Sequence, residues 1–195
     1  MSLDVYLNGN YLPLEEAHIS VLDRGFLFGD GVYEVIPVYA GKLFRFEQHI
    51  ERLNNSLAAI FMQPPMSTDA WRDVLEQLIR QLPGKDQAIY LQVTRGSTGK
   101  RDHTIPTNIT PTIFAMTRAS KAPDPAIKRE GVKAITLEDD RWKHCNVKAI
   151  TLLANVLAKQ AASDADAAEA ILIRHGKAME GAASNLFMVS NGLII

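Results

Sequence analysis

Two helical patterns set between runs of β-prone residues constrain the fold of this chain most strongly. Apolar residues recur every three or four positions in the two helical patterns, which is typical of helices with one buried face. The expected helices are residues 47–61 and 67–82, and the expected strands are residues 32–39, 88–94 and 112–117. Strands with intervening helices predict a layered α/β or α+β unit over residues 1–118.

The composition is that of an ordinary globular protein. Of the 195 residues, 47% are hydrophobic and 22% are charged, which is enough for one large or two small cores. The formal net charge of -1 argues against nucleic acid or an anionic membrane surface as a partner. No stretch resembles a membrane span or a secretory signal, so we expect a cytoplasmic protein that acts on small molecules.

A single cysteine, Cys145, excludes an intrachain disulfide and a cysteine-cluster metal site, and we predict no metal. We expect a buried, inert thiol at this position. Because Cys145 lies three residues before Lys148, the alternative is that its oxidation disturbs the region around this lysine.

The chain divides into two expected domains. An Asn-Gly pair within residues 5–12 predicts a β-hairpin near the start. Residues 119–131 are rich in proline, lysine and alanine, and they form the linker-like stretch at which we place the boundary. The second domain then covers residues 132–195. Its expected strands are residues 132–137, 170–174 and 184–189.

Lys148 is the residue with the most informative surroundings. An apolar stripe predicts an amphipathic helix, with Asn146 as its N-cap. The stripe consists of Ile150, Leu153, Ala154, Leu157, Ala158 and Ala161. Lys148 would lie in the first turn, where the helix dipole disfavours an ammonium. A neutral lysine can form an imine with a carbonyl such as that of pyridoxal phosphate. The alternative is an ordinary solvated lysine.

Four blocks of sequence, in order along the chain, carry a resemblance to a known family. They are DRGFLFGDGVYEV (Asp23 to Val35), HIERL (His49 to Leu53), the K-x-x-x-L-x-x-N run from Lys148 to Asn155, and MEGAASNLF (Met179 to Phe187). Together they resemble the fold-type IV pyridoxal-phosphate enzymes, and most closely the D-amino acid aminotransferases among them. The resemblance covers essentially the whole chain, although family members extend further at the C-terminus.

The resemblance implies an α+β fold of two domains, with a smaller α/β N-terminal domain and a β-barrel-like C-terminal domain that is incomplete here. It also implies an enzyme that uses pyridoxal 5'-phosphate and forms a homodimer. Lys148 would hold the cofactor as an internal aldimine. Since the family extends beyond the position of Ile195, we expect a C-terminally truncated chain.

The same resemblance assigns three further residues to the cofactor. Arg52 would bind its phosphate, for which a guanidinium is well suited. Glu180 would pair with the pyridine nitrogen, and Ser184 supplies a hydroxyl after Ala182 and Ala183. From the residues alone, Arg52 could instead pair with Glu47 or Glu51, and Glu180 could be an exposed carboxylate between two strands.

A basic loop between the last two strands of the first domain supplies the candidate substrate residues. Arg101-Asp102-His103 resembles the R-x-H of D-amino acid aminotransferases, whose arginine and histidine join a tyrosine in binding the substrate carboxylate. That tyrosine would be Tyr33 here. A guanidinium and two neutral donors suit a carboxylate. The alternative is a solvated basic loop.

The resemblance therefore predicts transamination of small amino acids, most closely of the D-series, such as D-alanine with 2-oxoglutarate as the keto acid. The alternatives on the same scaffold are an aminodeoxychorismate lyase, which releases pyruvate, and a branched-chain L-amino acid aminotransferase. An inactive cofactor-binding or dimerisation fragment is the alternative outside enzymes.

Overall fold

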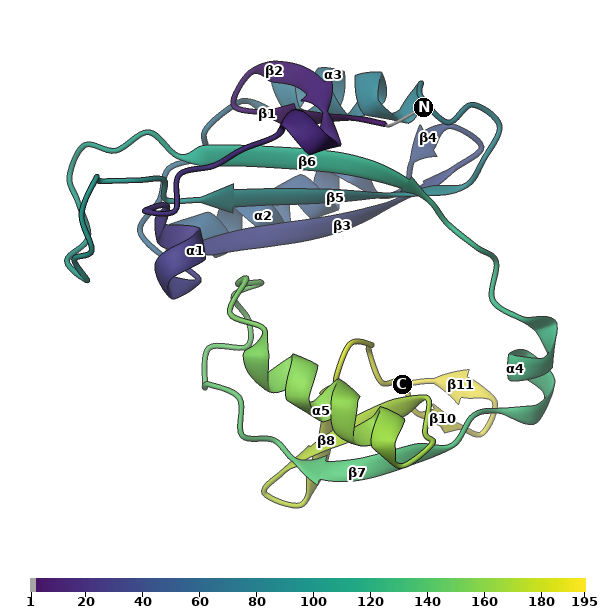
Figure 1. Cartoon of the computed structure of the whole chain (residues 1–195). Coiled ribbons are helices and arrows are strands. Elements are labelled where there is room, and N and C mark those ends of the chain that lie inside the picture. The colour runs from purple at the N-terminus through teal and green to yellow at the C-terminus, as the bar shows by residue number, and fades with distance from the viewer. Residues whose placement is uncertain (1–2) are drawn as a thin grey trace. The chain divides into compact units, whose positions relative to one another are not determined.

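The computed structural model describes residues 3–195, and they form two compact units (Figure 1). The first unit runs to Lys121 and also includes Asn146–Thr151. The second unit consists of Ala122–Cys145 and Leu152–Ile195. Lys148 therefore belongs to the first unit, whereas the sequence analysis assigned it to the second domain.

A six-stranded antiparallel sheet forms the first unit, in the order β2-β1-β6-β5-β3-β4. Its strands are β1 Asp4–Leu7, β2 Asn10–Pro13, β3 Gly31–Tyr39, β4 Lys42–Leu43, β5 Gln87–Thr94 and β6 Thr112–Ala119. The predicted hairpin is confirmed, because Asn8 and Gly9 join β1 to β2 with φ angles of 50° and 97°. Such left-handed angles are what an Asn-Gly turn supplies.

Helices α2 (Phe46–Ala59) and α3 (Thr68–Ile79) cover one face of this sheet (Figure 1). Burial alternates along β5 and β6, as expected for strands with one covered face. Each helix has one buried apolar face, as expected, and the Ser67 side chain caps α3. Phe61 is an exception, because α2 ends at Ala59 and the chain then turns with φ 60° at Phe61, which leaves that ring exposed. A short 3₁₀ helix (Leu14–Glu16) and α1 (Arg24–Phe28) complete the unit.

The second unit is built on a three-stranded sheet in the order β7-β8-β9. Its elements are α4 Pro125–Glu130, β7 Ala134–Glu138, α5 Leu153–Asp164, β8 Glu169–Arg174, β9 Lys177–Gly181, β10 Val189–Ser190 and β11 Leu193–Ile194. β7 and β8 are parallel, whereas β8 and β9 are antiparallel. The expected linker contains α4, which Asp124 caps through its side chain.

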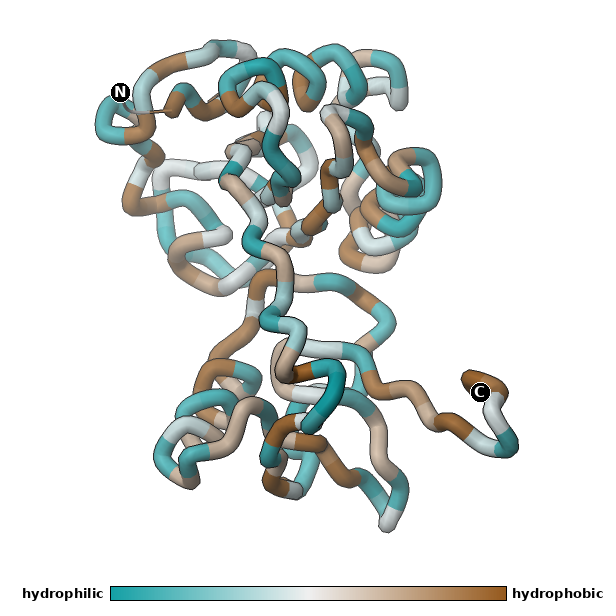
Figure 2. The backbone as a smooth tube through the Cα atoms, turned by 90° about the vertical axis from the view of Figure 1, so that its right-hand side faces the viewer, coloured by the Kyte–Doolittle hydropathy of each residue, from teal (hydrophilic) through white to brown (hydrophobic). Residues whose placement is uncertain are grey.

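Several expectations for the second unit are wrong. Helix α5 begins at Leu153, so neither Asn146 nor Lys148 belongs to it. Alanines form its buried face, whereas Leu153 and Leu157 are exposed. Residues 184–189 do not form the expected strand. The longer strand in this region is β9, which lies earlier in the chain and contains Glu180. The C-terminal end of the chain is apolar (Figure 2). Its residues Leu193 to Ile195 are exposed.

The mixture of helices with antiparallel and parallel strands confirms the α+β class. Among residues 3–195, none of the helices has the length and apolar character needed to span a membrane.

Candidate active site

Lys148 lies in an extended segment beside β3, not in a helix as the sequence analysis expected. An isolated antiparallel bridge joins Ala149 to Val32. The Tyr33 amide donates to the Lys148 carbonyl at 3.0 Å, and the Ile150 amide donates to the Gly31 carbonyl at 3.1 Å. Lys148 therefore lies outside the first turn of α5, and the expected effect of a helix dipole on its amine is wrong.

This register places the side chains of Lys148 and Tyr33 on the same face, because residues opposite each other in an antiparallel pair share a face. The ammonium nitrogen of Lys148 lies 4.2 Å from the centroid of the Tyr33 ring. No ion pair involves this ammonium among residues 3–195. The amine is thus held against an aromatic ring with its nitrogen not engaged by a carboxylate.

Helix α2 also holds the Lys148 segment. The hydroxyl of Ser56, which is buried, accepts a hydrogen bond of 3.2 Å from the Lys148 amide. Arg52 lies four residues before Ser56, and side chains at this spacing share one face of a helix. The same face of α2 therefore carries Arg52 and the residue that binds the Lys148 backbone, Ser56.

Arg52 forms a two-point ion pair with Glu34 of β3. Its Nε and Nη2 donate to Oε1 and Oε2 of Glu34 at 2.5 and 2.6 Å. His49 contacts the same carboxylate at 2.8 Å. The alternative in which Arg52 pairs with Glu47 or Glu51 is wrong, because Arg52 pairs with Glu34 and Glu47 pairs with Arg72. The Nη1 group of Arg52 has no hydrogen-bond partner among residues 3–195.

Glu34 remains charged although it is fully buried. Burial raises the pKa of this carboxyl group, but the hydrogen bonds from Arg52 and His49 outweigh burial and hold the pKa below its usual value. The hydrogen bond with Glu34 in turn raises the pKa of Arg52. The Arg52 side chain is 51% exposed, so it remains partly accessible.

Tyr33 contacts a second aromatic ring on β5. Its ring stacks on Tyr90 with the centroids 5.7 Å apart, and the Tyr90 hydroxyl donates to the Gln92 side chain at 2.6 Å. Burial and the neighbouring Tyr33 raise the pKa of Tyr90 to about 12. Tyr33 thus lies between Lys148 and Tyr90 on the face of the sheet opposite Glu34.

The loop of residues 95–111 brings Arg101 and His103 together on the ring of Phe28. The His103 ring lies 4.8 Å from this ring, and the Arg101 guanidinium carbon lies 5.2 Å from its centroid. Neither side chain has an ion-pair partner in the described part of the chain. No hydrogen bond or ring contact joins Tyr33 to either of them within residues 3–195.

Glu180 and Ser184 belong to the second unit, and each has a partner there. Glu180 lies in β9, not between strands, and forms an ion pair with Arg141. Arg141 also donates to Asp139 at 2.9 and 3.1 Å, and these bonds hold the pKa of Asp139 below its usual value. The Ser184 hydroxyl donates to Glu169 at 2.8 Å.

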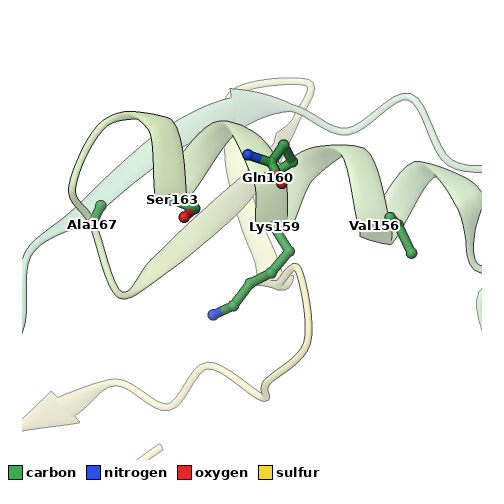
Figure 3. Close-up of a pocket in the computed structure, with 5 residues that line it drawn as sticks. All are labelled: Val156, Lys159, Gln160, Ser163 and Ala167. Atoms are coloured by element: carbon green, nitrogen blue, oxygen red, sulfur yellow. The ribbon is translucent and has the colours of Figure 1, made fainter.

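The second unit contains two further features, Cys145 and a hollow along α5. Cys145 is exposed, not buried as expected, and its thiol donates to the Trp142 carbonyl at 3.1 Å. A shallow hollow of about 450 Å³ lies along α5 (Figure 3). Its lining residues are Val156, Lys159, Gln160, Ser163 and Ala167, none of which was predicted as a site residue.

Sequence reasoning missed Glu34, His49 and Ser56. The signal was nevertheless available for the helix, because His49, Arg52 and Ser56 follow the three- and four-residue spacing of a single helical face. Glu34 follows Tyr33 on a strand, so it had to point to the opposite face. Only the packing of α2 on that face identifies it as the partner of Arg52.

Comparison with known proteins gives consistent results. The sequence profile of the family described as amino-transferase class IV matches residues 31–195. A D-alanine aminotransferase of Bacillus licheniformis is 40% identical over 192 residues, which are 98% of this chain and 67% of that protein. One of Listeria monocytogenes is 40% identical over 195 residues, again with 67% of that protein covered.

Solved structures show a similar fold. A branched-chain amino acid aminotransferase of Escherichia coli has a TM-score of 0.86 at 20% identity, over 100% of this chain and 67% of that one. A hypothetical aminotransferase of Mycobacterium tuberculosis in its PLP-bound form has a TM-score of 0.81 at 22% identity, over 96% and 68% of the two chains. The chain spans about two thirds of the length of these proteins.

Proposed function

Because the chain belongs to the class IV aminotransferase family, we propose that it transfers the amino group of a small D-amino acid, with D-alanine as donor and 2-oxoglutarate as acceptor. The cofactor is pyridoxal 5'-phosphate. The observation that carries this proposal is the ammonium of Lys148, which lies 4.2 Å from the Tyr33 ring centroid. The relatives named D-alanine aminotransferases support the choice of donor.

The residues of the chain fit this cofactor. An aldehyde needs an amine, and Lys148 offers one without an ion pair among residues 3–195. A phosphate needs fixed donors. The Nη1 group of Arg52 has no hydrogen-bond partner among residues 3–195, and Glu34 fixes the rest of the guanidinium. A pyridine nitrogen needs an acid, and the Glu180 side chain is 36% exposed beside Arg141. Ser184 is the remaining candidate, although its hydroxyl donates to Glu169 in this structure.

When bound, pyridoxal phosphate supplies a ring that accepts electrons from the α-carbon of the amino acid. Lys148 would hold this group through its aldehyde. Its nitrogen would also accept the α-proton of the amino acid and later deliver a proton. The Tyr33 ring orients this amine, and Ser56 fixes the backbone that carries it.

The substrate carboxylate is bound by Arg101 and His103 together with the Tyr33 hydroxyl. Arg101 supplies a guanidinium whose nitrogens have no ion pair among the described residues, and His103 supplies a ring nitrogen. Both side chains contact the Phe28 ring. A carboxylate site built from Arg101, His103 and Tyr33 favours amino acids that keep their carboxylate during the reaction, as transamination requires.

An absorbance titration tests the proposal directly. The purified protein is mixed with pyridoxal phosphate, scanned for the visible band of an imine, and then reduced with borohydride. Peptide mass spectrometry locates the reduced adduct. We expect a visible band and an adduct on Lys148, and neither in Lys148→Ala. An adduct on another lysine with Lys148 unmodified would contradict the assignment.

The reaction is then followed with D-alanine in the presence and absence of 2-oxoglutarate. Continuing pyruvate release that depends on the acceptor indicates transamination, whereas acceptor-independent turnover of aminodeoxychorismate would indicate the lyase. L-Leucine replaces D-alanine to test the branched-chain alternative. Full transamination by Lys148→Ala would exclude the proposed mechanism.

The homodimer and a domain boundary within residues 119–131 are also part of our proposal. Light scattering measures the mass of the protein in solution and so tests for the homodimer. Limited proteolysis measures the second, and we expect the earliest cleavage within residues 119–131.

A further inference from the structure

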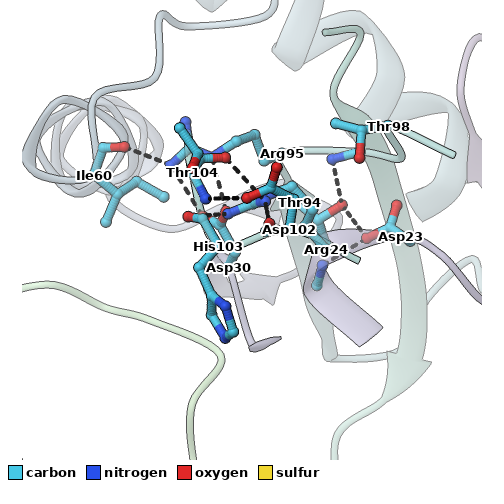
Figure 4. A network of polar contacts seen from close by, with 12 residues as sticks. Asp23, Arg24, Asp30, Ile60, Thr94, Arg95, Thr98, Asp102, His103 and Thr104 are labelled. Carbon is cyan, nitrogen blue, oxygen red and sulfur yellow. Dashed lines mark hydrogen bonds and ion pairs between the residues drawn. The ribbon is translucent and has the colours of Figure 1, made fainter. Parts of the chain in front are cut away.

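A buried cluster of two arginines and one aspartate lies at the base of the loop of residues 95–111 (Figure 4). Arg24 of α1 and Arg95 at the end of β5 both pair with Asp30, through contacts of 2.7 to 3.0 Å. Each arginine side chain is 4% exposed and Asp30 is 14% exposed. Charged side chains are this deeply buried only where they are paired.

One carboxylate is shared by two cations, so the remaining donors need other acceptors. Arg95 donates to the Ile60 and Phe61 carbonyls at 2.6 and 3.5 Å. Arg24 donates to three consecutive carbonyls in the loop, those of Asp102, His103 and Thr104. Both arginines are therefore buried and paired with Asp30. Arg95 bonds to residues 60–61, whereas Arg24 bonds to residues 102–104.

The three carbonyls are the main attachment of the loop's centre to the rest of the unit. Other polar contacts of residues 98–104 are local, such as the Thr104 amide with the Asp102 carboxylate at 2.9 Å and the Thr98 hydroxyl with the Lys100 carbonyl at 3.0 Å. Local contacts shape the loop but do not fix its position. Besides Arg24, the contact from α1 is the ring of Phe28, which meets Arg101 and His103.

Arg24 also contacts Phe28 directly. Its guanidinium carbon lies 5.0 Å from the centroid of the ring that bears Arg101 and His103. One side chain thus fixes both the loop backbone and the aromatic platform beneath it. Arg95, in contrast, makes no hydrogen bond or ion pair with residues 101–104 in the described part of the chain.

We propose that Arg24 is a positioning residue for the substrate carboxylate, which anchors the backbone of residues 102–104 and so holds Arg101 and His103 in place. The inference rests on the proposed function of those two side chains. Arg24 itself does not touch the substrate.

Two matched variants test this inference, Arg24→Met and Arg95→Met. Each removes one buried guanidinium and leaves Asp30 with the other arginine, so both should lower the thermal midpoint. Trypsin cleavage after Lys100 and Arg101, followed by mass spectrometry, measures the mobility of the loop. Steady-state kinetics with D-alanine measures its effect on substrate.

We expect Arg24→Met to be cleaved at these sites about tenfold faster than the unchanged protein, and its KM for D-alanine to rise about tenfold with kcat within about threefold. Arg95→Met should leave the cleavage rate and KM within about twofold. Arg24→Lys keeps the charge but loses the forked donors, so its KM should be intermediate. It also serves if Arg24→Met does not fold.

Equal cleavage of Arg24→Met and Arg95→Met would overturn the inference, because the loop would then respond to the loss of either arginine. Arg101→Ala separates this inference from the proposed function. If Arg101→Ala raises KM while Arg24→Met speeds cleavage of the loop without raising KM, the positioning role is wrong. The proposed binding of the substrate carboxylate by Arg101 is then still supported. If Arg101→Ala leaves KM unchanged, Arg101 does not bind the substrate carboxylate. The role of Arg24 in substrate binding is then also wrong.

Discussion

Tyr33 and Glu34 are neighbours on β3 with opposite environments. The side chain of Tyr33 faces Lys148 and Tyr90, whereas that of Glu34 is buried beneath α2 against Arg52 and His49. Successive residues of a strand point to opposite faces, so this single step along the chain connects the two sides of the sheet. The position of the amine and that of the guanidinium are thereby set by the same strand.

The substitution Glu34→Gln tests this arrangement. A buried carboxylate that accepts from Arg52 and His49 is replaced by a neutral group of the same shape, and Arg52 is half exposed, so part of its charge is rehydrated. We expect the free energy of unfolding to fall by about 2 kcal/mol, measured by urea denaturation. Glu47→Gln is the control, because Glu47 pairs with Arg72 at the surface and should change stability little. Equal losses would contradict the burial argument.

The same carboxylate predicts how stability depends on pH. Its folded pKa lies below the usual 4.5, so its contribution is fully present above about pH 4.5 and is lost as the pH falls through the folded value. The amide of the Glu34→Gln variant has no proton to bind, and the stability difference between the two proteins should be constant near neutral pH and narrow below pH 4.5. Urea midpoints of both proteins between about pH 7 and pH 3 give this difference. A gap that widens in acid would contradict the predicted sign.

At the scale of elements, the stem of the loop of residues 95–111 depends on Gly96. This glycine has φ 90°, and a Cβ there would lie 2.1 Å from the Thr110 carbonyl oxygen across the stem. Gly99 in the same loop has φ 74°, but nothing lies within 4 Å of its Cβ position. The two glycines therefore share left-handed backbone and differ in the close approach of a second segment.

We expect Gly99→Ala to cost about 1 kcal/mol, from left-handed backbone alone. Gly96→Ala adds a collision with a backbone oxygen that cannot rotate away, so its cost should be about 2 to 4 kcal/mol. Thermal denaturation of both variants measures the difference. A Gly96→Ala loss no larger than that of Gly99→Ala would show that the stem opens without cost.

Elements with local signals were predictable from the sequence, and those held by distant partners were not. The Asn8-Gly9 hairpin and the helix capped by Ser67 carry their instructions within a few residues. The Lys148 segment does not, because its apolar spacing is equally typical of a helix, and only pairing with Val32 and Tyr33, more than one hundred residues earlier, makes it extended. Strand pairing at such separation leaves no periodic mark on one of its partners.

The candidate site shows the same division. The resemblance predicts Lys148, Arg52 and the loop of residues 95–111 as parts of the site, because each lies in or near a short block of sequence. It could not identify Glu34 as the partner of Arg52, since the two residues lie on different elements that meet only through packing. Arg24 was part of a quoted block, yet its donors reach carbonyls, which any residue supplies and which no sequence pattern reveals.

For the whole molecule, the two units differ in the cores that stabilise them. The first contains large buried side chains such as Trp71, Phe46 and Leu53, whereas the second is built on Ala158, Ala162 and other small residues. Burial of apolar surface contributes roughly 25 cal/mol per Å², so small side chains supply less of it. Exposed apolar residues on α5 and in the segment from Phe187 to Ile195 add nothing to the core of the second unit.

The second unit should therefore unfold at a lower urea concentration than the first, and the chain should not behave as a two-state protein. The two tryptophans of the sequence report on this separately, since Trp71 is buried in the first unit and Trp142 is 48% exposed in the second. Fluorescence of Trp142→Phe follows the first unit, and fluorescence of Trp71→Phe follows the second. The circular dichroism of each variant should then contain both transitions. Urea titration of the unsubstituted protein is the control, because Trp71→Phe also weakens the first core. If fluorescence and circular dichroism of that protein give coincident transitions, the small core of the second unit is stabilised as strongly as the large one.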